Sequence, residues 1–114
     1  EDNPEVLKLA HAILEGHGYR VLDAATPGEA IARAELPGEK IHLLLTDVIM
    51  PGLNGPELYN TLREFAPGLK VLYMSGYTDN AVVNNGLLEG DISYLQKPFT
   101  AQSLVRKVRV ALDA

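Results

Sequence analysis

The sequence predicts an α/β fold: a doubly wound parallel sheet with helices on both faces. Segments with a helical hydrophobic period alternate with short strand-like segments along the 114 residues, and two of those strands are almost wholly apolar. Strands that alternate with helices imply a parallel sheet joined by right-handed crossovers. At this length we expect one domain, residues 1–114.

Helices are predicted where apolar residues recur at spacings of three and four, at residues 4–16, 27–36, 56–65 and 100–112. Pro4 and Pro27 suit first helical turns, and Gly16 suits a helix end. A weaker helix is expected at residues 79–88, where three asparagines and a glycine lower the helix propensity.

Strands are predicted at residues 19–25, 41–47, 70–74 and 92–96. Residues 41–45 and 71–74 are nearly all apolar, which is typical of strands covered on both faces. The other two strands are mixed because they contain Arg20, Asp23, Ser93 and Gln96. We therefore expect the two mixed strands at the edges of the sheet.

The composition excludes several classes of function. With no cysteine, the chain has no disulfide framework, zinc–thiolate site or cysteine nucleophile. Its 10 basic and 15 acidic residues give a net charge of −5 without a basic patch, so no direct nucleic-acid binding is expected. No apolar run approaches the ~20 residues of a membrane-spanning helix, so we expect a cytoplasmic domain that does not insert into a membrane.

Polar residues end three different predicted strands: Asp47, Ser75 and Lys97. In open α/β sheets, ligands bind outside the carboxyl ends of the strands. The fold is therefore expected to bring an acid, a hydroxyl and an amine into one pocket.

Four segments resemble the signature segments of the receiver domain of two-component response regulators, the CheY-like family. They are Glu-Asp-Asn at 1–3, Leu-Thr-Asp-Val-Ile-Met-Pro-Gly at 45–52, Met-Ser-Gly-Tyr at 74–77 and Gln-Lys-Pro-Phe at 96–99. The amino-acid sequences of these segments are most similar to those in receivers of hybrid sensor histidine kinases. The resemblance covers the whole chain and implies a flavodoxin-like sheet of order 2-1-3-4-5.

The resemblance assigns Asp47 as the phosphoacceptor, which takes a phosphoryl group from a phosphohistidine to form an aspartyl phosphate. It implies Mg²⁺ as the cofactor, held by Glu1, Asp2, Asp47 and the backbone carbonyl of Ile49. Hard oxygen ligands suit this ion. The domain alone is then a phosphoacceptor rather than a turnover enzyme.

Three further residues have roles that the resemblance implies. Lys97 pairs with Asp47 or with the phosphate, and the Lys97–Pro98 peptide bond that follows it is cis in the family. Ser75 donates a hydrogen bond to a phosphoryl oxygen. Tyr94 changes orientation when Ser75 moves, which switches the surface of helix 4, strand 5 and helix 5.

The partners implied are a histidine kinase or a histidine phosphotransfer domain, together with receiver self-association. The full-length protein is a candidate hybrid sensor histidine kinase, through which the domain would be tethered to the membrane.

One departure concerns the start of the chain. Family members have an apolar strand before the acid pair, whereas this chain starts at Glu1. We interpret the sequence as a piece of a longer chain that lacks the first strand. The sheet is then expected to be open between the strands at 19–25 and 41–47.

Two other functions stay open at the level of sequence. One is a non-phosphorylated receiver-fold interaction module, suggested by that start and by Arg106, Lys107 and Arg109 on the last helix. The other is an aspartyl phosphatase, which ranks last because residue 49 is isoleucine where a general acid would be needed. Ile49 cannot orient an attacking water, so a persistent acyl phosphate is also expected.

Overall fold

The computed structural model describes residues 1, 3–36, 38, 40–49, 52–75 and 94–114. Within them, helix α1 (Pro4–Gly16) and helix α2 (Pro27–Ala34) precede strand β1 (Leu43–Asp47). Helix α3 (Gly55–Leu62), strand β2 (Lys70–Ser75), strand β3 (Tyr94–Gln96) and helix α5 (Ala101–Asp113) follow in that order. The expected helix at 79–88 and the start of the expected strand at 92–96 lie outside the described residues.

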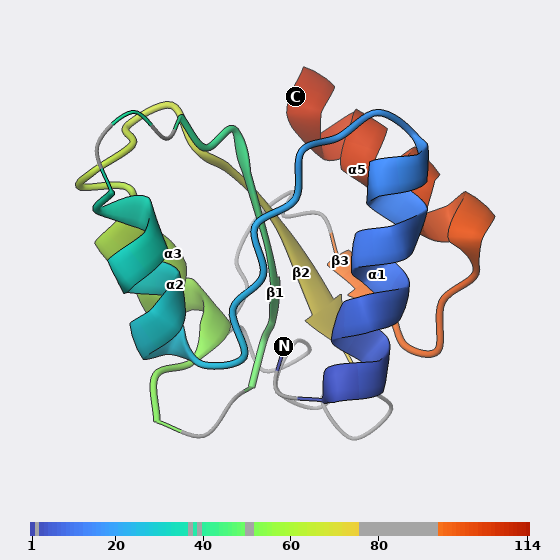
Figure 1. Cartoon of the computed structure of the whole chain (residues 1–114), viewed down its shortest axis with the longest axis horizontal. Coiled ribbons are helices and arrows are strands. Elements are labelled where there is room, and N and C mark those ends of the chain that lie inside the picture. The colour runs from blue at the N-terminus through green and yellow to red at the C-terminus, as the bar shows by residue number, and fades with distance from the viewer. Residues whose placement is uncertain (2, 37, 39, 50–51, 76–93) are drawn as a thin grey trace.

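The three described strands form a parallel sheet in the order β1-β2-β3. Helices α1 and α5 lie on one side of it, and α2 and α3 lie on the other (Figure 1). This three-layer arrangement confirms the predicted α/β class with parallel strands. The full order 2-1-3-4-5 stays a prediction.

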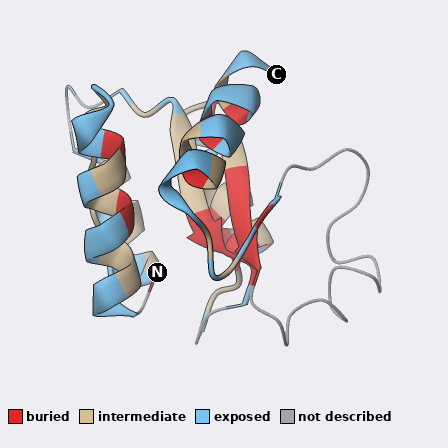
Figure 2. Ribbon diagram, turned by 90° about the vertical axis from the view of Figure 1, so that its right-hand side faces the viewer, coloured by how far each residue is buried: buried red, intermediate tan, exposed pale blue. Residues whose placement is uncertain are grey.

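Side chains alternate between the two faces of the sheet, as the period of a strand requires. Leu43 and Leu45 pack against the cluster under α1 and α5, which includes Leu72, Met74, Leu104 and Val108. Leu44 packs against the cluster under α2 and α3. Figure 2 shows buried residues on the strands of the sheet and on helix faces turned toward the sheet.

Residues 19–25 differ from the prediction, because the structure assigns them no strand. The expected alternation is present: Tyr19, Val21 and Asp23 are partly buried, whereas Arg20 and Leu22 are exposed. A strand also needs a neighbour for its backbone hydrogen bonds. In the described part of the sheet, β1 pairs with β2 alone.

The same pairing makes β1 an edge strand of the described sheet, which is consistent with the opening expected between residues 19–25 and 41–47, although an apolar sequence is typical of a central strand. Two mixed strands were expected at the edges, and β3, which represents one of them, lies at an edge of the described sheet. Among the described helices, none is long and apolar enough to cross a membrane.

Candidate functional site

The carboxyl ends of the three strands lie side by side. Asp47 at the end of β1 is in register with Met74 of β2, which is in register with Leu95 of β3. Beyond these positions the backbone pairing continues, since the Lys97 N–H donates to the Ser75 carbonyl at 2.8 Å. The ends of β1, β2 and β3 therefore form one rim, and we use "rim" below for the site around Asp47, Ser75 and Lys97.

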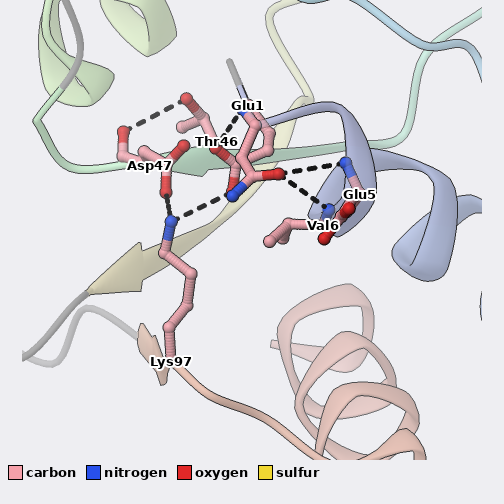
Figure 3. A network of polar contacts seen from close by, with 7 residues as sticks. Glu1, Glu5, Val6, Thr46, Asp47 and Lys97 are labelled. Atoms are coloured by element: carbon pink, nitrogen blue, oxygen red, sulfur yellow. Dashed lines mark hydrogen bonds and ion pairs between the residues drawn. The ribbon is translucent and has the colours of Figure 1, made fainter.

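Lys97 reaches across the rim to two acids (Figure 3). Its Nζ lies 2.5 Å from Asp47 Oδ1 and 3.0 Å from Glu1 Oε1. Both carboxyl side chains are almost fully buried, while the Lys97 side chain is 25% exposed. The Asn3 N–H donates to Glu1 Oε2 at 3.1 Å, which holds the second acid in place.

The electrostatics of this cluster follow from burial and from two acids sharing one base. Burial, and then the neighbouring Glu1, raise the pKa of Asp47 to about 6, against the opposing effect of Lys97. Burial alone would also raise the pKa of Glu1, but contacts with Asp47, Lys97 and the Asn3 N–H outweigh it and lower this pKa to about 2. The two carboxyl groups titrate as a pair.

At neutral pH the cluster therefore carries two negative charges against one positive charge. The ionised Asp47 has both carboxylate oxygens buried, and neither accepts a hydrogen bond within the described structure. Oδ1 has its ion pair with Lys97, which leaves Oδ2 uncompensated. Such a site favours a further cation.

The donor chemistry of the rim fits a hard divalent ion, because Glu1 and Asp47 offer carboxylate oxygens. Among the described residues, no three His, Asp or Glu side chains converge as a metal-binding group. Asp2, the third acid expected to hold Mg²⁺, lies outside the described residues. Ile49, whose carbonyl was the fourth expected ligand, is 46% exposed two residues beyond Asp47.

Ser75 and Tyr94 occupy different environments. Ser75 ends β2 one position beyond the register partner of Asp47, and it is fully buried. Tyr94 begins β3 opposite Tyr73, with 41% of its surface exposed. Both residues lie on adjacent strands near the rim, while their proposed coupling stays a prediction. The Lys97–Pro98 peptide bond is cis, as expected.

Sequence reasoning missed one residue of the rim, Gly55, which it placed in the loop before the third helix. In the structure Gly55 begins α3, and Asn54 and Glu57 form a capping box there. The Gly55 N–H donates to the Val48 carbonyl at 2.8 Å, so the helix start lies directly against the end of β1. A glycine just before a predicted helix is typical of a loop, so the sequence carried no indication of this contact.

Comparison with known proteins agrees with this geometry. The family model described as response regulator receiver domain matches residues 1–109. The chain is 32% identical over 113 residues to the sensor kinase CckA of Brucella abortus, and this match covers 99% of the chain and 12% of the kinase. It is also 32% identical to the response regulator receiver protein CpdR of Brucella abortus, across 100% of the chain and 93% of that protein.

Solved structures of receiver domains have similar folds. The receiver domain of the hybrid histidine kinase CckA superposes with a TM-score of 0.79 at 32% identity, covering 98% of this chain and 94% of that one. A receiver domain protein from Clostridium thermocellum superposes with a TM-score of 0.83 at 27% identity, covering 99% and 90%. Receivers within kinases and stand-alone receivers are thus both similar to this chain.

Proposed function

This chain belongs to the response regulator receiver domain family of two-component signalling, and we propose that its Asp47 accepts a phosphoryl group from a phosphohistidine. The observation that carries the proposal is the buried Asp47 carboxylate, which is ion-paired to Lys97 through one oxygen and whose other oxygen has no hydrogen bond from the residues that the structure describes. A carboxylate oxygen with neither a proton nor a hydrogen bond is available as a nucleophile.

In the proposed step, an Asp47 oxygen forms a new P–O bond while the P–N bond to the donor histidine breaks. The electron pair of the broken bond returns to the imidazole nitrogen, and the product is an aspartyl phosphate. Lys97 is within reach to pair with the phosphoryl oxygens, because its Nζ already lies at Asp47 Oδ1. Ser75 is proposed to donate its hydroxyl to another phosphoryl oxygen.

Glu1, Asp2, Asp47 and the Ile49 carbonyl are the proposed Mg²⁺ ligands. When bound, the ion supplies positive charge that offsets repulsion between the carboxylate and the phosphoryl group. The excess negative charge of Glu1 and Asp47 over Lys97 supports this assignment. Tyr94, exposed on β3, is proposed to change orientation after phosphorylation and so to alter the adjacent surface.

The proposed phosphodonor is a histidine kinase or a histidine phosphotransfer domain in the cytoplasm. Similarity to the sensor kinase CckA and to the stand-alone CpdR supports both settings, a receiver fused to a kinase and a free receiver. Self-association of the domain after phosphorylation belongs to the same proposal.

Incubation with acetyl phosphate and Mg²⁺ tests the phosphoacceptor. Intact-mass measurement should show one added phosphoryl group, absent in Asp47→Asn. Asp113→Asn is the matched control, since Asp113 pairs with Arg109 on α5 away from the rim and should accept the group normally. No adduct on the native chain, or an adduct on Asp47→Asn, would overturn the proposal.

Magnesium titration separates the phosphoacceptor from a non-phosphorylated interaction module. Saturable binding should raise the free energy of unfolding by about 2.7 kcal/mol at a hundredfold excess over Kd. Asp47→Ala should abolish this stabilisation. If the native chain and Asp47→Ala respond alike, the interaction module becomes the better account.

A further inference from the structure

The backbone conformation of residue 55 does not explain why this residue is a glycine. It is the first residue of α3, and it is not among the described glycines with positive φ, which are Gly18, Gly38 and Gly52. Any residue could adopt its helical backbone, and alanine is generally the better helix former. The reason for glycine must therefore be the space around it.

That space is closed by the backbone of the phosphoacceptor. A Cβ built on Gly55 would lie 2.2 Å from the Asp47 carbonyl oxygen and 3.2 Å from the Asp47 carbonyl carbon. It would also lie 3.2 Å from Cδ1 of the buried Tyr73 ring. Because the nearest atom belongs to the backbone, no change of rotamer relieves the contact. A Cβ on Gly16, in contrast, would meet nothing within 4 Å.

The backbone next to Asp47 has little room to move away. The Val48 N–H donates to the Met74 carbonyl of β2 at 3.0 Å. The Val48 carbonyl accepts from the Gly55 N–H at 2.8 Å. The Thr46 hydroxyl donates to the Asp47 carbonyl at 3.2 Å (Figure 3). Val48, the residue that follows Asp47, is thus held between β2 and the first residue of α3.

We infer that Gly55 is a positioning residue for Asp47: its bare Cα and the Thr46 hydroxyl together hold the Asp47 carbonyl, and so set where the Asp47 carboxylate lies. The Asp47 side chain and the Asp47 carbonyl are attached to the same Cα, so a shift of the carbonyl also moves the carboxylate. Asp47 Oδ1 lies 2.5 Å from Lys97 Nζ, and this ion pair depends on that position. A methyl group at position 55 has to displace the Asp47 backbone to fit. The inference rests on the proposed role of Asp47 for its consequence, but the geometry can be tested without phosphorylation.

The test compares Gly55→Ala with Gly16→Ala, a matched control at the last residue of α1. The first readout is the ¹³Cγ resonance of Asp47 in metal-free buffer, assigned by its loss in Asp47→Asn. We expect Gly55→Ala to shift this resonance and Gly16→Ala to leave it in place. The second readout is phosphoryl uptake from acetyl phosphate with saturating Mg²⁺, which should fall by about tenfold to a hundredfold in Gly55→Ala, because a displacement near 1 Å has this effect on reacting groups.

Folded Gly55→Ala with the native Asp47 resonance and native uptake overturns the inference. If Gly55→Ala does not fold, Thr46→Val decides, since it removes the hydroxyl from the same carbonyl without adding volume. It should shift the Asp47 resonance in a folded chain, and an unshifted resonance overturns the inference. If the native chain takes up no phosphoryl group, the proposed function fails, while the resonances still decide whether Gly55 positions Asp47.

Discussion

The rim around Asp47 and the segment of residues 19–25 were both predicted from strand-like sequence, yet only the rim is built from paired strands. β1, β2 and β3 exchange backbone hydrogen bonds, and their ends bring Asp47, Ser75 and Lys97 into adjacent positions. Residues 19–25 keep the alternating exposure of a strand, but the structure assigns them no strand. The difference teaches that alternation predicts which side chains are buried, whereas pairing depends on which segment lies alongside.

Side chains hold residues 19–25 in place of a hydrogen-bonded ladder. Tyr19 and Val21 pack against the core cluster under α1 and α5. His11 of α1 contacts Asp23 through Nδ1 at 2.7 Å and Glu15 through Nε2 at 2.7 Å. The segment is therefore attached to α1 by a contact that depends on the protonation of one imidazole.

Removal of the Lys97 charge should destabilise the rim more than any other substitution considered below. Lys97→Met leaves two buried carboxylates facing one another, so we expect the free energy of unfolding to fall by about 3 kcal/mol at neutral pH without Mg²⁺. This is the lower end of the usual range because the Lys97 side chain is 25% exposed. Urea denaturation measures the change.

Lys107→Met is the control for Lys97→Met, because Lys107 is exposed on α5. Its effect should stay within about 0.5 kcal/mol. Adding Asp47→Asn to Lys97→Met should recover part of the loss, since one of the facing charges is removed. Equal losses for the two lysine variants would show that Lys97 does not compensate the acids.

Substitution of Ile49 tests how fast phosphate is released at the rim and should leave the fold of the rim unchanged. Ile49 is 46% exposed and has no polar group to orient a water beside Asp47. In the phosphorylated protein, Ile49→Asn should speed phosphate release by about tenfold. Ile49→Val is the control and should release phosphate at the native rate. Faster release from the native chain than from Ile49→Asn would contradict the expected persistence of the acyl phosphate.

Substitution of His11 tests the segment instead of the rim and should have the smallest effect. The hydrogen bond with Asp23, and then that with Glu15, raise the pKa of His11 above its usual 6.5. A raised folded-state pKa stabilises the fold below about pH 6.5, and this contribution is lost as the pH rises through the raised value. The stability difference between the native chain and His11→Gln should therefore shrink with increasing pH.

Urea midpoints recorded from about pH 5 to about pH 9 measure this dependence on His11. His17→Gln is the control, because His17 contacts the Ile13 carbonyl and no carboxylate within the described contacts. A difference between the native chain and His11→Gln that stays constant over this range would mean that the imidazole does not hold residues 19–25 through its charge.

Much of the rim could be predicted from the sequence, because its residues follow apolar runs that end in polar residues. Asp47 and Lys97 meet as the strand-end rule predicts. The role of Gly55 could not be recognised from the sequence. It depends on the Asp47 carbonyl, eight positions earlier in the chain, lying next to the Gly55 Cα in the folded protein. The Lys97 contact with Glu1 likewise joins residues 96 positions apart.

The hydrophobic periods of the sequence by themselves determined the described helices, the parallel α/β class and the strand ends that carry polar residues, because these depend on local repeats and on burial of one face. Tertiary structure alone decided that residues 19–25 form no strand in the described sheet and that Gly55 closes on the Asp47 carbonyl. Those outcomes depend on which distant segments become neighbours, and backbone pairing and steric contact exist only after that choice has been made.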